Sequence, residues 1–582
     1  MSSDKEIEEL VKKYCLSNAV KHGGKCNPGA VLGKVLGEQP TLKANIKVVS
    51  QYTEKMAKEV NSMSPIEQES LLSKYTIAIK PIKHEEEFRN LPPLPDYKKY
   101  SFIVTRFAPN PDSVLHLGSA RAIVLSYEYA RTYKGKFILR FEDTDPRLKK
   151  ASLPFYQSIR DDLEWLGCTW DEEYIQSDRL LIYYEYARKL IEVDGAYVCT
   201  CKVDDFKRKL LKKKSCQCRK LPLSEHLNRL SKMLDGTYTE GKAVLRVKTD
   251  LNHPNPAVRD WPALRIVDTR KNVHARVGSK YNAWPLYNFA AGLDDHLMGV
   301  THIIRGKEHF TNMIRQKFMY DYLSWTYPTA IHYGRLKIEG GVLSKSKIIQ
   351  GVTNGMYTGF DDPRLATFQA LRKRGLLPQA IRQIIYEVNI KPVDATISWA
   401  RLYSINKKLI DKVSPRYFVV LNPIILSIKP IEKEMKLSLR RHPDVESMGY
   451  RTIYLTPSQD KEVKVWVDKE DLTKVKPYDL FRLMGFANIC NLKVMESSAK
   501  AEFHSFDMHI ARNKAAPLIH WLPAEDNVKV KMIDQEAQVH HGFGEKGLLE
   551  EPINSVVQLE RVGFARIDTK EGGEVTLYFT SK

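Results

Sequence analysis

The sequence PNPDSVLHLGSAR, residues 109–121, joins the apolar run 102–104 to the apolar run 122–125. A loop between a strand and a helix presents free backbone N–H groups and a positive dipole end, both suited to binding phosphate. His116 adds a hydrogen-bond donor for a phosphate oxygen, and Gly118 lets the backbone approach a ligand closely. The alternative interpretation is that His116 caps or packs against the helix and that Gly118 is an ordinary turn residue.

A second candidate segment is GRLKIEGGVLSKSK, residues 334–347. Its glycines precede Ser344, Lys345, Ser346 and Lys347, which indicates an adaptable basic loop. A lysine in such a loop can neutralise the charge that develops on a triphosphate. The alternative is a solvated basic loop without a ligand.

Four of the eight cysteines form two close pairs, Cys199-x-Cys201 and Cys216-x-Cys218. Four thiols can bind zinc tetrahedrally, although the C-x-C spacing is tighter than that of the usual zinc finger. The sequence leaves two interpretations open, a structural Zn²⁺ site or four free reduced thiols. So few cysteines in 582 residues, without an export signal, favour a reducing compartment and hence a cytoplasmic location.

The elements that must position these residues alternate between strand and helix. SFIVTRF and KFILRF predict strands, whereas residues 117–133 and LPFYQSIRDDLEWLG predict helices. This alternation predicts an α/β catalytic domain with a Rossmann-type parallel sheet, which binds ligands beyond the carboxyl ends of its strands. The pattern breaks at about residue 197 and resumes at about residue 280, so an inserted domain splits the sheet.

The remaining sequence predicts flanking domains, one helical and the others rich in β-strands. Ile7, Leu10, Val11 and Tyr14 fall on one helical face in a polar N-terminal region, and short β-rich runs after residue 400 predict antiparallel β-barrels. We therefore expect six segments: an N-terminal helical region (1–98), the halves of the catalytic domain (99–196 and 280–350), the inserted domain (197–279), a helical connector (351–400) and a double β-barrel region (401–582).

The charge of the chain favours a polyanionic partner. Lys and Arg exceed Asp and Glu by 21 residues, and nine of the 19 residues in 202–220 are basic. Nucleic acid or a membrane surface would bind such a chain, and the alternative is a merely solvated cationic surface. The basic segment suits contact with a phosphate backbone. The sequence has no apolar run of 18 residues, so we expect no membrane span.

Several motifs, in order along most of the chain, resemble those of class I aminoacyl-tRNA synthetases. HLGS at 116–119 is similar to the HIGH signature but ends in serine, and VLSKS at 342–346 is similar to KMSKS but departs at its first two positions. Other stretches resemble glutamyl- and glutaminyl-tRNA synthetases, namely FILRFEDTDP, WPLYNFA, GVTHIIRGKEH, RRHPDVESMGYR and PLIHWLP. The β-rich C-terminus and the short helical N-terminal extension are most similar to archaeal glutamyl enzymes.

The resemblance implies that L-glutamate and ATP, with Mg²⁺, form glutamyl-adenylate and that a terminal ribose hydroxyl of tRNA then takes the glutamyl group. It also implies that the inserted domain binds the acceptor stem and that the barrels bind the anticodon. The implied catalytic residues are His116 and Lys345. The implied ATP-binding residues are Asn110, His116, Gly118, Ser119, Arg335, Leu336, Leu343, Ser344 and Lys345.

For glutamate, the resemblance implies contacts with Arg106, Glu142, Tyr287 and Arg305. Arg106 matches the position that grips the side-chain carboxylate, which an arginine fork can bind through two hydrogen bonds. Glu142 matches the position that holds the ammonium group, and Tyr287 matches a residue that lines the pocket. Glutaminyl enzymes place a small neutral residue where this chain has Arg305. The alternatives are that Arg106 and Glu142 form surface ion pairs and that Arg305 binds a backbone carbonyl.

Three other functions stay open at this point: a glutamine–tRNA ligase, a small-molecule nucleotidyltransferase and a catalytically dead tRNA-binding protein. Arg305 is the feature against the first, and the basic, β-rich region after residue 400 is the feature against the second. Intact His116, Lys345 and Glu142 argue against the third. We expect a monomer that charges glutamate-specific tRNA. The sequence does not decide whether glutamine-specific tRNA is charged as well.

Overall fold

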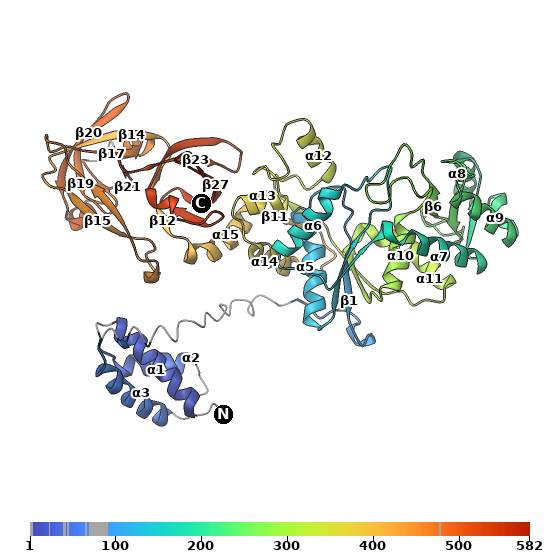
Figure 1. Cartoon of the computed structure of the whole chain (residues 1–582), viewed down its shortest axis with the longest axis horizontal. Coiled ribbons are helices and arrows are strands. Elements are labelled where there is room, and N and C mark those ends of the chain that lie inside the picture. Colours follow the sequence, from blue (N-terminus) through green and yellow to red (C-terminus); the bar gives the residue numbers. More distant parts are fainter. Residues whose placement is uncertain are drawn as a thin grey trace. The chain divides into compact units, whose positions relative to one another are not determined.

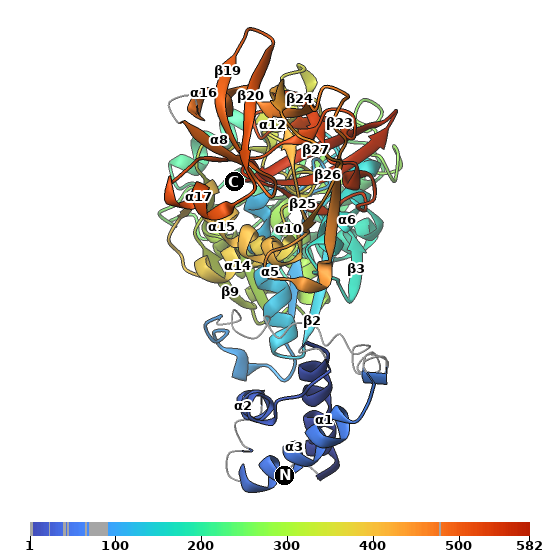
Figure 2. The ribbon, with the colours of Figure 1, turned by 90° about the vertical axis from the view of Figure 1, so that its left-hand side faces the viewer.

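The computed structural model describes residues 4–21, 24–38, 42, 46–64, 67–68, 71, 91–475 and 479–582. Its contacts divide the chain into two compact units, Met1–Asn90 and Leu91–Lys582. Three helices of the first unit pack against one another (Figure 1, Figure 2), and these are α1 (Asp4–Lys21), α2 (Pro28–Glu38) and α3 (Ile46–Asn61).

The N-terminal unit folds around the apolar faces of its helices. Ile7 and Val11 of α1 are buried, and Leu10 and Tyr14 pack partly buried against the same core, as their spacing predicts. Asn27 precedes α2, and its side-chain oxygen accepts hydrogen bonds from two backbone N–H groups of the first turn. A side-chain cap of this kind stabilises a helix by about 1 kcal/mol.

The α/β part of the second unit is built on two groups of parallel strands. One group is β1 (Val104–Phe107), β2 (Lys136–Phe141) and β3 (Glu172–Ile175), and the other is β8 (His302–Gly306) and β9 (Thr329–Tyr333). The Thr301 N–H donates to the Val104 carbonyl at 3.0 Å, which places β8 beside β1. The predicted split parallel sheet is therefore confirmed.

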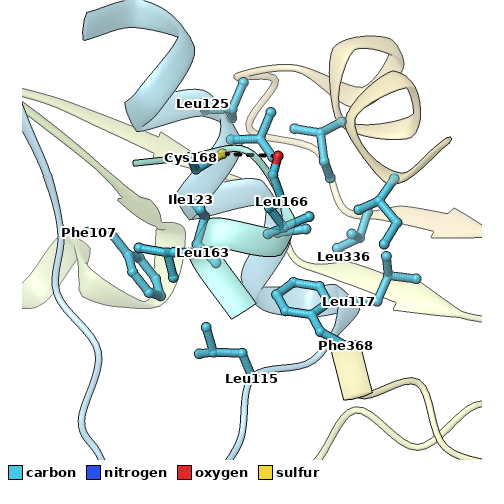
Figure 3. Close-up of a cluster of buried hydrophobic side chains, with 14 of the residues drawn as sticks. Phe107, Leu115, Leu117, Ile123, Leu125, Leu163, Leu166, Cys168, Leu336 and Phe368 are labelled. Atoms are coloured by element: carbon cyan, nitrogen blue, oxygen red, sulfur yellow. Dashed lines mark hydrogen bonds between the residues drawn. The ribbon is translucent and has the colours of Figure 1, made fainter. Parts of the chain in front are cut away.

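Helices connect these strands and enclose the core. They are α5 (Leu117–Thr132), α6 (Leu153–Trp165), α7 (Leu180–Glu192), α10 (Tyr287–Leu297) and α11 (Phe310–Tyr322). Leu115 and Leu117, on either side of His116, are buried in a core that also contains Leu336 and Phe368 (Figure 3). This packing holds the backbone on both sides of His116. None of the helices in the described part of the chain combines the length and apolar character needed to cross a bilayer.

The insertion forms an antiparallel sheet of its own. Its strands pair in the order β4 (Ala196–Cys199), β5 (Val244–Val247), β6 (Pro262–Ile266) and β7 (Ala283–Pro285). Two helices, α8 (Val203–Leu211) and α9 (Leu223–Leu234), lie between β4 and β5 in the sequence. The exposed lysines of the basic segment include Lys207 on α8 and Lys212, Lys213 and Lys214 just after it.

Two segment boundaries differ from the predicted ones. Residues 91–98 belong to the larger unit rather than to the N-terminal region. The reason is that Leu94 is buried in the catalytic core and the Tyr129 hydroxyl donates to the Pro92 carbonyl at 2.9 Å. The insertion's sheet also extends past residue 279, because β7 completes it by pairing with β6.

A helical connector follows the second half of the catalytic domain. It contains α12 (Lys345–Thr353), α13 (Phe368–Lys373), α14 (Pro378–Val388) and α15 (Trp399–Ile410), and β10 (Leu336–Ile338) pairs in parallel with β11 (Ala395–Ile397). An isolated β-bridge joins His116 to Thr367, immediately before α13. The connector thus contacts the first candidate segment directly.

The C-terminal region forms two seven-stranded sheets, with strand orders β12-β25-β26-β27-β23-β24-β13 and β21-β18-β19-β20-β14-β17-β22. In each sheet the edge strands are neighbours in the chain: β12 (Arg416–Tyr417) with β13 (Val419–Val420), and β21 (Leu518–Ile519) with β22 (Leu522–Pro523). Each sheet therefore curls back on itself as a barrel (Figure 1).

The other barrel strands are β14 (Pro423–Lys429), β17 (Val463–Asp468), β18 (Leu480–Leu483), β19 (Asn488–Val494), β20 (Ser498–Ser505), β23 (Val528–Ile533), β24 (Val539–Gly544), β25 (Val556–Leu559), β26 (Gly563–Glu571) and β27 (Glu574–Ser581). Most neighbours are antiparallel, as predicted, but β12–β25, β14–β20, β18–β21 and β23–β27 are parallel. A hairpin (β15, Met435–Arg440; β16, Tyr450–Leu455) and two helices (α16, Lys469–Val475; α17, Met508–Asn513) complete the region.

Candidate active site

His116 is the N-cap residue of α5. Its Nδ1 accepts a hydrogen bond from the Gly118 N–H at 3.1 Å, which places the ring proton on Nε2. Burial, together with the positive charge of Lys345, lowers the pKa of His116 to about 4, so the ring is neutral near pH 7. A Cβ at position 118 would lie 2.8 Å from ring atom Cε1, so any larger residue there would force the His116 ring to shift. His116 is a helix cap and also a neutral N–H donor.

Lys345 reaches from the start of α12 to the first candidate segment. Its Nζ donates to Asp112 Oδ1 at 2.7 Å and to the Asn110 carbonyl at 3.3 Å. Asn110 Oδ1 and Ser113 Oγ are buried and have no hydrogen-bond partner within the described residues. Because buried polar atoms are normally paired, these two atoms fit a loop that binds a polar ligand. The structure therefore brings the two candidate segments into contact.

The neighbours of these residues lie at the same junction. Ser119 belongs to the first turn of α5, and its N–H donates to the His116 carbonyl at 2.7 Å. Leu343 is partly buried against the catalytic core, and its Cδ1 would lie 3.7 Å from a Cβ at position 118. Ser344 is exposed at the N-cap of α12. All three are close to the His116 loop or to Lys345.

Arg335 and Leu336 lie differently from the other residues predicted to bind ATP. Leu336 is only 8% exposed and its side chain packs in the catalytic core (Figure 3). The Arg335 side chain is 63% exposed, and its Nε lies 3.8 Å from Glu308 Oε2. Its backbone N–H donates to Asp394 Oδ1. The side chain of Leu336 is thus part of the core and that of Arg335 is part of the surface.

A second group of charged residues gathers at the carboxyl ends of the parallel strands. Arg106 lies on β1, Glu142 directly follows β2, Arg305 lies on β8 and Tyr287 begins α10. Burial raises the pKa of the Tyr287 hydroxyl, and the charges of the other three residues act on the same group. The four residues predicted to bind glutamate therefore lie near one another. A parallel α/β sheet binds its ligands at this edge.

Arg106 and Glu142 are joined through two residues that the sequence did not point to. Arg106 donates to both carboxylate oxygens of Asp295, from Nε at 3.0 Å and from Nη2 at 3.3 Å. Arg140 donates to Asp295 at 2.8 Å through Nη1 and to Glu142 at 2.9 Å through Nη2. Burial raises the pKa of Glu142 despite both arginines. Ion pairs are present, as in the alternative interpretation, but they are buried rather than on the surface.

Arg305 is 5% exposed and binds side chains rather than a backbone carbonyl. Its Nη2 donates to the Tyr327 hydroxyl at 3.1 Å and to Gln316 Oε1 at 3.3 Å. Its Nη1 is buried and has no hydrogen-bond partner among the described residues. A buried guanidinium with an unused N–H group fits a site that accepts an anion.

Two histidines close to Arg305 also went unnoticed in the sequence. Burial and the charge of Arg305 lower the pKa of His309 and that of His332 to about 4, so both rings are neutral near pH 7. The centroid of the His309 ring lies 5.3 Å from that of the Tyr287 ring.

The sequence does contain one signal for Asp295. GLDDHL places two adjacent acids in a helix beside apolar residues, and acids that become buried in such a helix are normally paired with cations.

The four paired cysteines meet in the inserted domain. The Sγ atoms of Cys199 and Cys216 are 3.9 Å apart and those of Cys201 and Cys218 are 3.7 Å apart, and all four sulfurs lie within 4.8 Å of one another. A tetrahedral Zn²⁺ with bonds of about 2.3 Å requires S···S distances of about 3.8 Å, so the residues fit this metal.

The pKa values of two of these thiols are shifted in opposite directions. Hydrogen bonding between Cys199 and Cys216 raises the pKa of Cys199 and lowers that of Cys216 to about 5. The Arg229 guanidinium donates to Cys218 Sγ at 3.5 Å. The lowered pKa of Cys216 and the hydrogen bond to Cys218 suit thiolate ligands, since the thiolate is the form that binds metal.

Comparison with known proteins identifies the same functional regions. Residues 102–412 match the catalytic domain of class I (E and Q) tRNA synthetases, and residues 414–507 and 518–568 match two anticodon-binding domains of these enzymes. A solved glutamate tRNA ligase from Elizabethkingia meningosepticum, in complex with its amino acid, aligns with 22% identity and a TM-score of 0.39 over 54% of this chain and 70% of that one.

Two similar curated proteins are the glutamate–tRNA ligases of Pyrococcus furiosus and Thermococcus kodakarensis. The first is 48% identical over 586 residues and the second is 47% identical over 583 residues. Each alignment covers 99% of this chain and 100% of the relative. With the catalytic and anticodon-binding models matched in order, the chain belongs to the class I tRNA synthetases of the glutamate and glutamine (E and Q) family.

Proposed function

We propose that this protein is a glutamate–tRNA ligase, which attaches L-glutamate to the 3′ end of tRNA and releases AMP and pyrophosphate. The observation that carries the proposal is near-half identity with glutamate–tRNA ligases over 99% of the chain. The catalytic and anticodon-binding domains supply the two parts that this reaction needs, a site for nucleotide chemistry and a region for tRNA.

The reaction has two steps. An oxygen of the glutamate α-carboxylate attacks the α-phosphorus of ATP, the bond from this phosphorus to the bridging oxygen breaks, and pyrophosphate leaves. A terminal ribose hydroxyl of tRNA then attacks the adenylate carbonyl carbon, and AMP leaves. Mg²⁺, bound with ATP, neutralises phosphate charge. The protein therefore acts mainly by positioning the reactants and stabilising charge.

His116 and Lys345 are the proposed catalytic residues. His116 Nε2–H donates to a phosphate oxygen, and its depressed pKa keeps the ring in the neutral form with this proton. The Lys345 ammonium group exchanges its ion pair with Asp112 for an ion pair with the phosphates. There it stabilises the negative charge that develops as pyrophosphate leaves. Asn110, Gly118 and Ser119 line the ATP site, and Leu343 and Ser344 border it. Arg335 and Leu336 contribute backbone atoms rather than side chains.

Arg106, Glu142, Tyr287 and Arg305 form the proposed glutamate site. Glu142 holds the ammonium group, the two arginines hold the side-chain carboxylate, and Tyr287 lines the pocket. Together with Arg140 and Asp295, the site contains three arginines and two carboxylates, a net charge of +1 when both acids are ionised. Glutamate carries −1 and glutamine carries 0, so this balance supports glutamate as the substrate.

The Cys199, Cys201, Cys216 and Cys218 cluster is the proposed site of a structural Zn²⁺ ion. The metal would cross-link β4 to the turn after α8, beside the small core that contains Tyr197 and Phe206. Small clusters of this kind gain stability from a metal because they bury little apolar surface.

We further propose that the enzyme is cytoplasmic and monomeric. We also propose that α8 and the lysines after it contact the phosphate backbone of tRNA.

Aminoacylation of separate glutamate- and glutamine-specific tRNA transcripts, with each amino acid, tests the proposal. Wild-type protein should charge glutamate, and the second transcript shows whether glutamine-specific tRNA is also accepted. Removing one partner of a buried charge pair costs ~2–5 kcal/mol. This is roughly a 30- to 4,000-fold loss in kcat/KM for glutamate in Arg305→Gln. Preference of the wild type for glutamine would instead identify a glutamine–tRNA ligase.

A control for Arg305→Gln is Arg179→Gln. Arg179 is a part-buried arginine that donates to the buried Asp294 Oδ1 at 2.9 Å, and it lies outside the proposed glutamate site. This variant should keep the glutamate preference of the wild type. Glutamyl-tRNA formation at the wild-type rate in Arg305→Gln would remove Arg305 from the site.

A further inference from the structure

Helix α10 contains two adjacent acids, Asp294 and Asp295, whose side chains are both fully buried. Consecutive residues on a helix point about 100° apart, so the two carboxylates face different surroundings. Asp294 accepts hydrogen bonds from Arg179, Gln176 and Tyr183. None of these three residues belongs to the proposed glutamate site, so Asp294 serves the packing of α10 against α7 and the segment before it.

Asp295 faces the proposed site instead. Its two oxygens accept hydrogen bonds from Arg106 Nε and Nη2, an arrangement that fixes the plane of the guanidinium. The same carboxylate accepts from Arg140 Nη1. Burial opposes the ionisation of Asp295, but the charges of both arginines outweigh it and lower its pKa to about 2. Asp295 is therefore a permanent anion between two cations.

The geometry at Arg106 leaves one edge free for a substrate. Asp295 occupies the Nε and Nη2 edge, and Nη1 makes no hydrogen bond within the described part of the chain. A carboxylate from outside can bind the remaining edge of the fork. Without Asp295, Arg106 would keep its charge and lose its fixed direction.

Arg140 links Asp295 to Glu142, the residue proposed to hold the substrate ammonium group. Its side chain is fully buried, and it bridges Asp295 to Glu142 through its two terminal nitrogens. One carboxylate thus orients both the arginine proposed for the substrate carboxylate and the acid proposed for the substrate ammonium group. It also balances one arginine charge, which sets the net charge of the site at +1.

We propose that Asp295 is the positioning residue of the amino-acid site, which holds Arg106 directly and Glu142 through Arg140. This inference rests on the proposed function of that site. It assigns to Asp295 a role in the binding of glutamate and none in the binding of ATP. Asp294 has the same chemistry and burial on the same helix, and it is the matched control.

The test measures aminoacylation by the full-length chain with tRNA present, varying glutamate and ATP separately. Asp295→Asn should raise the KM for glutamate roughly 30-fold or more, because it removes one partner of a buried charge pair. The KM for ATP should stay within about threefold, as expected for an effect confined to one substrate. Asp294→Asn should leave both KM values near those of the wild type.

A thermal unfolding curve of each variant separates positioning from structure. A purely structural role for Asp295 would lower Tm and affect both substrates alike, and this result would overturn the proposal. An unchanged KM for glutamate in Asp295→Asn, or an equal rise in Asp294→Asn, would overturn it as well. The same assay first measures whether the wild-type protein charges tRNA with glutamate. A wild-type protein that does not would contradict the proposed function rather than the role of Asp295.

Asp295→Glu keeps the proposal testable if the asparagine variant does not fold. The substituted glutamate side chain keeps a negative charge between the two arginines, and its carboxylate lies one methylene group further from the backbone. The KM for glutamate should then rise about tenfold, since a displacement of about 1 Å in a positioning group is costly. A KM for glutamate equal to that of the wild type would overturn the proposal.

Discussion

The Nζ of Lys345 donates to Asp112 Oδ1 at 2.7 Å, across 233 residues of sequence. This pair joins the lysine of the second candidate segment to the loop that ends in His116. The Asp112 side chain is 20% exposed and that of Lys345 is 34% exposed, so the pair is accessible to solvent. An accessible ion pair is weak, and a triphosphate can displace the carboxylate from the lysine.

Replacing Lys345 with alanine should slow adenylate formation about 10²- to 10³-fold, the usual cost of removing a preorganised group that stabilises developing charge. The KM for glutamate should change little, because the lysine meets charge in the transition state. Stopped-flow or pyrophosphate-exchange kinetics measure this step. Lys347→Ala, an exposed lysine two residues further on, is the control. A raised KM with an unchanged turnover number would contradict this role.

The stability of the catalytic core should depend on the titration of Asp162. This side chain of α6 is fully buried, its oxygens have no hydrogen-bond partner within the described residues, and burial raises its pKa to about 7. The folded state therefore binds the proton more tightly than the unfolded chain. The resulting stability is fully present below the unfolded pKa of about 3.9 and is lost as the pH rises through about 7.

Asp162→Asn should remove this dependence. Relative to the wild type, the variant should become more stable as the pH rises from about 5 to about 8, by an amount on the order of a few kcal/mol. Urea unfolding at these two pH values measures the difference. Glu164→Gln changes an exposed acid of the same helix and should leave the pH dependence of the wild type intact. Parallel pH curves for the wild type and Asp162→Asn would contradict the prediction.

The cysteine cluster predicts a measurable metal content. Purified protein should contain about one zinc per chain by elemental analysis. Cys216→Ser should lose the metal and loosen the inserted domain, which hydrogen exchange at β4 and α8 would detect. Cys490→Ser, outside the cluster, should keep the metal. Metal-free protein with full activity and the same exchange pattern would eliminate the zinc site.

The basic segment after α8 predicts a steep effect of salt on tRNA binding. Replacing the exposed Lys212, Lys213 and Lys214 with alanine should flatten the slope of log K against log salt by about 0.7 to 0.9 for each phosphate contact that is lost. Filter binding at several salt concentrations measures this slope. Alanine at the exposed Lys98 and Lys99 is the control. An unchanged slope in the triple variant would place the tRNA contact elsewhere.

The sequence alone was sufficient for the features that depend on near neighbours. The alternation of apolar runs predicts β1, β2 and α5, because helix and strand periodicity reflect the local geometry of the backbone. His116 followed by Gly118 marks a helix start, and the structure places His116 at that cap. The two cysteine pairs are visible as possible ligands because only their spacing is needed.

Only the tertiary structure decided which of these residues meet. Arg106 and Asp295 lie 189 residues apart, and nothing in their local sequences shows that one orients the other. The parallel barrel pairs likewise join strands that are distant in the chain. The sequence determined the types of group present and the elements that hold them. Their pairing and burial, and hence their pKa values, depended on how the whole chain packs, because charge interactions and desolvation act through space.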